Sequence, residues 1–281
     1  MFPARKLVAC IHVALASNGE SSYRDAVHIA ELAQKRWGAD CTVITDRESL
    51  VVPGATIGYV QDAALLLRFI TVLVYRYSPD HDILFVMSSH GYSAGVHQFV
   101  TLNGEKVTDA QLGQAVYANM HQSSLSLCLL DTCHSGTLLD LRHHTAMDAL
   151  SITSLPSSVA VAGQSALSIA IGACGDQESS EEGISTAGGW GGGLIAEFLD
   201  AFPSTDDDVK VDSKEINQFD VVLFFANIHH KFTHKTIIPG NIVGDRQQHP
   251  VMSFTTRAAD TYNIQASLRI LKGQGQHQSL A

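Results

Sequence analysis

Short apolar runs alternate along the chain with segments in which apolar residues recur at helical spacing. The runs have the length of buried strands, and polar or glycine-containing turns follow them. The segments with helical spacing lie between them and end near glycine or proline. The expected strands are residues 6–15, 41–45, 83–87, 125–130, 166–174 and 251–255, and the expected helices are residues 21–37, 61–75, 109–120, 194–202 and 216–229.

This alternation of strands and helices predicts an α/β fold. Strands that are apolar throughout are typical of a sheet that is buried on both faces. Helices between consecutive strands provide the crossovers that parallel pairing needs. We therefore expect a central, mainly parallel sheet of about six or more strands, with helices on both faces.

Reactive side chains follow two of the expected strands. One strand ends in DTCHSG, residues 131–136, and another ends in SSHG, residues 88–91. In open α/β sheets, ligands bind outside the carboxyl ends of the strands. An imidazole there can take the proton of a thiol or pair with the thiolate. We therefore expect Cys133 to be a nucleophile and His90 its base.

The surroundings of Cys133 favour the same chemistry. A helix is expected to begin just after the cysteine, and the positive end of a helix stabilises a thiolate. The oxyanion of an acyl transfer needs fixed donors, and the backbone N–H groups of Cys133 and Gly91 are the expected pair, since glycine permits close approach. His134 is adjacent to the cysteine, but consecutive side chains diverge, so His90 is preferred as the base.

These motifs resemble those of the metacaspases, the caspase-like cysteine peptidases of organisms other than animals. SSHG is similar to the family's SGHG, and DTCHSG is similar to its D-[ST]-C-H-S-G block. ACGDQESS, residues 173–180, resembles the family's CxDDQxSAD segment, and QHPVMS, residues 248–253, resembles its closing QxPxLS. The matches fall in the family's order and run through most of the chain, and DTCHSG is highly specific.

The resemblance implies a caspase-like fold and an endopeptidase that cleaves after Arg or Lys through a thioester acyl-enzyme. In metacaspases an acidic pocket selects these basic side chains. A carboxylate pair suits a guanidinium group because it offers bidentate, charge-assisted hydrogen bonds. By motif, the pocket residues correspond to Asp131, Ser88 and Asp25. Asp25 lies in SYRD, where the family has CxND, and its alternative interpretation is a solvated residue in the first turn of a helix.

The resemblance also implies activation by calcium, which takes six to eight oxygen ligands. Asp109 and Asp140 correspond to two of the family's ligands. The aspartate that usually follows the first is Ala110 here, and in the shortened acidic segment only Glu105 can substitute. We therefore expect a depleted calcium site and no organic cofactor. For Asp109, capping of a helix N-terminus is the alternative interpretation.

Length and composition constrain the organisation of the chain. The 281 residues, 45% of them hydrophobic, can bury a substantial core. We expect one caspase-like domain with a large catalytic portion at residues 1–140, a linker at 141–165, a small portion at 166–260 and a tail at 261–281. No apolar run is long enough to predict a membrane span.

Charge and cysteine content narrow the partners and the compartment. Five cysteines without framework spacing indicate reduced thiols in a cytoplasmic, intracellular setting. The net charge of -10 disfavours nucleic acid as a partner. The expected partners are protein or peptide substrates that contain Arg or Lys. The resemblance implies a monomer, and Arg142 is a hypothetical self-cleavage site.

Three further features receive structural interpretations. The glycine cluster at residues 188–193 is interpreted as a flexible loop beside the substrate cleft, and Cys174 as a buried structural thiol. Three acidic residues that follow the fifth strand are interpreted as an exposed loop, with an acidic rim as the alternative: Glu178, Glu181 and Glu182.

Two alternative functions stay open. One is a cysteine peptidase of different specificity on the same sheet. The other is a catalytically silent interaction or scaffold protein that kept the fold. The presence of both Cys133 and His90, together with Asp131 and Ser88, weighs against the silent form.

Overall fold

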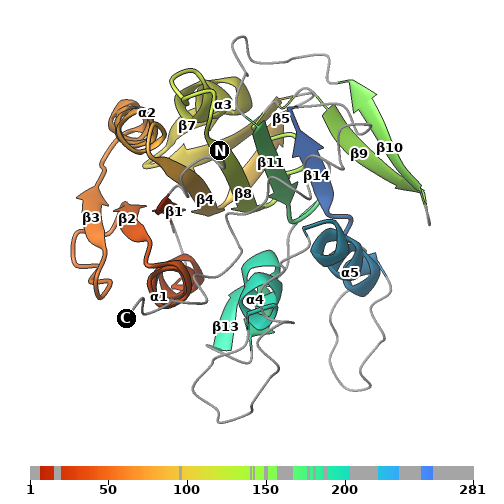
Figure 1. Ribbon diagram of the computed structural model, residues 1–281, viewed down its shortest axis with the longest axis horizontal. Coiled ribbons are helices and arrows are strands. Elements are labelled where there is room, and N and C mark those ends of the chain that lie inside the picture. Colours follow the sequence, from red (N-terminus) through yellow and green to blue (C-terminus); the bar gives the residue numbers. More distant parts are fainter. Residues whose placement is uncertain are drawn as a thin grey trace, which may run out of the picture.

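A nine-stranded sheet forms the centre of the molecule in the computed structural model (Figure 1). The structure describes residues 7–15, 20–94, 97–139, 141, 143–148, 151–156, 167–175, 178–179, 182–185, 189–202, 221–233 and 248–255. The strand order is β10-β9-β14-β11-β8-β4-β1-β2-β3. Its strands are β1 Leu7–Ala14, β2 Asp40–Thr45, β3 Thr56–Tyr59, β4 His81–Ser88, β8 Leu125–Asp131, β9 His143–Asp148, β10 Ser151–Pro156, β11 Leu167–Gly172 and β14 Val251–Phe254.

Most neighbouring strands of this sheet are parallel. The pairings from β3 through β2, β1, β4 and β8 to β11 are all parallel. The pairings β11 with β14, β14 with β9, and β9 with β10 are antiparallel. The prediction of a mainly parallel α/β sheet is confirmed.

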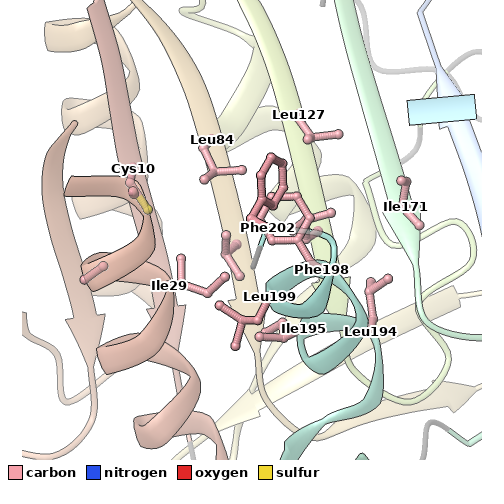
Figure 2. Packing of buried hydrophobic residues seen from close by; sticks show 14 of the residues in the cluster. Cys10, Ile29, Leu84, Leu127, Ile171, Leu194, Ile195, Phe198, Leu199 and Phe202 are labelled. Atoms are coloured by element: carbon pink, nitrogen blue, oxygen red, sulfur yellow. The ribbon is translucent and has the colours of Figure 1, made fainter. Parts of the chain in front are cut away.

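Helices cover both faces of the sheet (Figure 1). They are α1 Ser21–Trp37, α2 Ala63–Tyr77, α3 Asp109–Tyr117, α4 Gly193–Asp200 and α5 Val221–Thr233. Apolar residues of α1, α4 and α5 share one buried cluster with the sheet, whereas those of α2 and α3 share the cluster on the other face. Figure 2 shows Phe198 and Phe202 packed toward the strands that carry Leu84 and Leu127. Among the helices of the described ranges, none combines the length and the apolar character that a membrane crossing requires.

The hydrophobic pattern located the longer elements within a few residues. In α1 the apolar positions at helical spacing are buried, and the helix ends at Gly38, whose φ of 60° is left-handed. The N-cap of this helix is Glu20, whose side chain makes no capping hydrogen bond. At α3 the cap is Thr108, whose hydroxyl accepts from the Gln111 N–H in a capping box.

Several short elements were not expected from the pattern. They are β3, a three-stranded sheet of β5 Gly91–Ala94, β6 His97–Leu102 and β7 Glu105–Thr108, and a hairpin of β12 Glu182–Ser185 and β13 Gly189–Gly192. The segment expected to be a linker contains β9 and β10, which extend the central sheet. The glycine cluster expected to be a loop includes β13 and the start of α4. Strands of four residues carry too few positions for a reliable periodicity, which explains why the pattern missed β3, β5, β7, β12 and β13.

Candidate active site

The two motif-bearing strands lie side by side and end together. β4 and β8 are parallel neighbours, and Ser88 is paired with Asp131. The N–H of Ser89 donates to the carbonyl of Asp131 at 3.4 Å. The residues that follow both strands therefore leave the sheet at the same edge, as the sequence predicted.

Gly91 packs directly against the main chain of Cys133. A Cβ atom added to Gly91 would lie 1.8 Å from the carbonyl oxygen of Cys133, so no side chain fits at this position. His90, which precedes this contact, is exposed, and Cys133 is partly buried. The structure thus brings Gly91 into contact with Cys133 and places His90 directly before this contact in the chain.

Residues 132–136, which we call the cysteine turn, have an unusual backbone. His134 has a φ of 57°, a left-handed conformation that is uncommon for a residue other than glycine. Its N–H donates to the carbonyl of Glu178 at 2.9 Å. This amide is therefore committed to Glu178, and the Cys133 and Gly91 amides stay the predicted oxyanion donors. Residues 132–139 form turns, so the expected helix after Cys133 and its dipole contribution are wrong.

The three expected pocket residues face the same side of the sheet. Ser88 and Asp131 continue the alternate positions of β4 and β8 that pack against α1 and α4. Asp25 lies on the buried side of α1. Asp25, Ser88 and Asp131 are 3%, 2% and 6% exposed, so the alternative of a solvated Asp25 is wrong.

Gly192, at the junction of β13 and α4, lies between the two carboxylates. Its N–H donates to the carboxylate of Asp25 at 3.2 and 3.3 Å to the two oxygens. The N–H of Ile195 donates to Asp131 Oδ2 at 2.8 Å. A Cβ added to Gly192 would lie 2.3 Å from the same Asp131 oxygen. Two residues far apart in the sequence, Asp25 and Asp131, are thus gathered around one glycine.

Burial dominates the electrostatics of Asp131. It raises the pKa of this carboxyl to about 7, although the N–H groups of Ile195 and Leu194 act in the opposite direction. The carboxyl is therefore ionised less readily than that of an exposed aspartate. A cation that reached it would restore the ionised form.

His12 is a buried polar neighbour of this group that the sequence did not reveal. It lies in the middle of β1, is 1% exposed, and its Nε2 is 3.0 Å from the hydroxyl of Ser88. Burial lowers the pKa of His12 to about 3, so the imidazole is neutral at physiological pH. The one available signal was a histidine inside an otherwise apolar strand, LVACIHVA.

Glu178 contacts the cysteine turn through its carbonyl, and its side chain is partly exposed, at 28%, within the loop that follows β11. Its carboxylate accepts from the N–H of Gly175 at 3.0 Å and from the N–H of His249 at 2.8 Å. Cys174 lies beside it, and burial raises the pKa of that thiol to about 12. The interpretation of Cys174 as a buried thiol is confirmed.

The two described carboxylates expected to bind calcium accept hydrogen bonds from backbone N–H groups. Asp109 accepts from the N–H of Gln98 at 3.2 Å and of Ala110 at 2.7 Å, and Glu105 accepts from the N–H of Ala63 at the start of α2 at 2.8 Å. Within the described ranges, no three His, Cys, Asp or Glu side chains are grouped to hold a metal ion. Two positions of interest, Asp140 and Arg142, lie outside the described residues.

Comparison with known proteins adds no family assignment. No protein-family model matches the chain, and no curated protein matches it significantly. Function must therefore be argued from the motifs and from the geometry around Cys133.

Proposed function

We propose that the protein is a caspase-like cysteine endopeptidase that cleaves after Arg or Lys. The observation that carries the proposal is the contact between Gly91 and Cys133 at the paired ends of β4 and β8, beside a buried carboxylate pair. This arrangement supports a site in which the nucleophile Cys133, the base His90 and the acidic specificity group lie at one edge of an α/β sheet. Such sheets bind ligands at this edge.

In this proposal Cys133 and His90 perform the chemistry. His90 accepts the thiol proton, and the sulfur attacks the carbonyl carbon of the scissile bond. The amides of Cys133 and Gly91 stabilise the resulting oxyanion. His90 then protonates the leaving amine, which leaves a thioester on Cys133, and water attacks this thioester with His90 as the base.

The carboxylates of Asp25 and Asp131 provide the selection for basic side chains. Both are shielded from water, so a guanidinium that reaches them gains strong charge-assisted hydrogen bonds. The neutral His12 orients Ser88 without adding a positive charge that would repel the substrate.

Cleavage of fluorogenic peptides with Arg, Lys, Asp or an uncharged residue before the scissile bond tests the proposal. We expect cleavage after Arg and Lys alone, and a loss of about 10³-fold or more in kcat/KM for Cys133→Ala and His90→Ala. Cleavage after uncharged residues would indicate a different peptidase. Folded wild-type protein that cleaves none of the peptides would indicate the scaffold alternative.

The same assay tests the calcium expectation. Because Glu105 and Asp109 bind backbone N–H groups, we expect cleavage to persist in EDTA. Cleavage that needs added Ca²⁺ would instead assign the site to residues beyond the described ranges.

A further inference from the structure

The main chain of Glu178 holds the cysteine turn in place. Its carbonyl accepts from the N–H of His134 at 2.9 Å, directly after the nucleophile. The same carbonyl accepts from the thiol of Cys174 at 3.3 Å, and that thiol lies 3.6 Å from the carbonyl of Thr132. One carbonyl therefore joins the turn to the end of β11.

The side chain of Glu178 fixes that carbonyl by tying two other segments together. Its carboxylate accepts from the N–H of Gly175 just after β11, and from both the N–H and the Nδ1 of His249 just before β14. The distance from Glu178 Oε1 to His249 Nδ1 is 2.5 Å. The cysteine turn is thus connected through a single residue to two strands that lie beyond β8.

Other contacts bring the same segments to the turn. The amide of Gln248 donates to the carbonyl of Ala173 at 2.7 Å, and the hydroxyl of Ser253 donates to the carbonyl of Gly136 at 3.2 Å. A Cβ on Gly172 would lie 2.6 Å from the carbonyl oxygen of Ser135, so the turn rests closely on β11. These contacts hold the end of the turn, whereas Glu178 holds the residue beside the nucleophile.

The turn needs outside support because its own conformation is unfavourable. A left-handed backbone costs a non-glycine residue about 1–2 kcal/mol. His134 adopts it while donating to Glu178. An error of about 1 Å in the position of a reacting group can lower a rate by about 10²-fold. The rigidity of the contact at His134 therefore bears directly on the reactivity of Cys133.

We propose that Glu178 is a positioning residue for Cys133, with the Glu178–His249 pair locking the carbonyl that holds the His134 amide. This inference rests on the proposed function, since it concerns the same nucleophile. Ion pairs with partly exposed members contribute little to global stability. The loss of this pair is therefore expected to change reactivity far more than folding.

The chain offers a matched control in Glu197. Glu197 on α4 pairs with Lys231 on α5, and the side chains of Glu178 and Glu197 are similarly exposed, at 28% and 20%. Replacing either residue by alanine removes one negative charge and one ion pair. Of these two glutamates, Glu178 is the one with a contact to the cysteine turn among the described residues.

The test measures alkylation of Cys133 by iodoacetamide, together with kcat and KM for an Arg peptide. Iodoacetamide is small and uncharged, so it reports on the thiol without needing the carboxylate pair, and Cys133→Ala gives the background from the four buried cysteines. For Glu178→Ala we expect alkylation and kcat to fall about 10–100-fold while KM stays within about twofold. Glu178→Gln keeps the acceptor geometry and is expected to recover part of the loss. Glu197→Ala is expected to match wild type.

Four outcomes decide the inference. Equal alkylation rates and equal kcat values in Glu178→Ala and Glu197→Ala would overturn it. An effect of Glu178→Ala on KM alone would also overturn it, and so would a fall in kcat that is matched by a fall in the thermal unfolding temperature. Alkylation that depends on Glu178 in a protein that cleaves no basic peptide would uphold the positioning role and reject the proposed peptidase.

Discussion

Asp131 and Glu178 both lie next to the cysteine turn, and their pKa values shift in opposite directions. Asp131 precedes Cys133 by two residues and is 6% exposed, and burial raises its pKa to about 7. Glu178 contacts the residue after Cys133, and its pKa lies below the ordinary value. Burial is the largest single influence on both groups, and it disfavours the charged form of both.

The difference lies in what opposes burial. Two backbone N–H groups at the start of α4 do not offset the burial of Asp131. At Glu178, the N–H groups of Gly175 and His249 and the His249 imidazole together do offset it. The Glu178 carboxylate thus has an imidazole partner from the chain itself, His249. Under the proposed function, the guanidinium of a substrate plays the corresponding part for Asp131.

The largest expected effect comes from removing the charge of Asp131. Asp131→Asn keeps an oxygen for the Ile195 N–H but offers no charge to a guanidinium. Loss of one partner from a buried ion pair costs about 3–5 kcal/mol, so we expect kcat/KM for Arg peptides to fall at least about 10²-fold. As the control, iodoacetamide should alkylate Cys133 at the same rate in wild type and in Asp131→Asn. An unchanged preference for Arg would place the specificity group elsewhere.

The same substitution should change the pH dependence of stability. Because the folded-state pKa of Asp131 is raised, its contribution is fully present below about pH 4 and is lost as the pH rises through about 7. A rise from 3.8 to about 7 corresponds to at most about 4 kcal/mol. Urea unfolding should therefore show Asp131→Asn to gain stability over wild type between pH 5 and pH 8. A difference that does not change with pH would show that Asp131 titrates normally.

The smallest expected effect is on the pH dependence of stability at the Glu178–His249 pair. The lowered pKa of Glu178 contributes stability above about pH 4 that is lost as the pH falls through the lowered value. His249→Gln removes part of the cause, so its stability should fall less than that of wild type between pH 6 and pH 3. Because both side chains are partly exposed, the difference should be under about 1 kcal/mol by urea unfolding. A larger difference would mean that the pair supports the whole fold.

The sequence predicted what depends on local pattern and on strand ends. Continuous apolar runs predicted β4 and β8, and the rule that ligands bind at carboxyl ends of strands placed His90 and Cys133 together. The motif resemblance added Asp25, which the structure brings to within contact of Gly192.

What the sequence could not predict depends on distant backbone donors. Glu178 and His249 are 71 positions apart, and no periodicity reports that the carboxylate of one meets the amide of the other. His12 is hidden in the same way, since its partner Ser88 is 76 positions away. At two of the expected calcium ligands, Glu105 Oε2 and both carboxylate oxygens of Asp109 accept backbone N–H groups, which the sequence did not reveal.

The position of β14 in the sheet has a consequence for the time at which the site forms. β14 lies between β11 and β9, although both precede it in the chain, and its flanking residues His249 and Ser253 support the cysteine turn. During synthesis, Cys133 leaves the ribosome long before this strand exists. A nascent chain therefore carries Cys133 before the contacts from His249 and Ser253 can form, so the cysteine turn gains this support only after β14 has been synthesised.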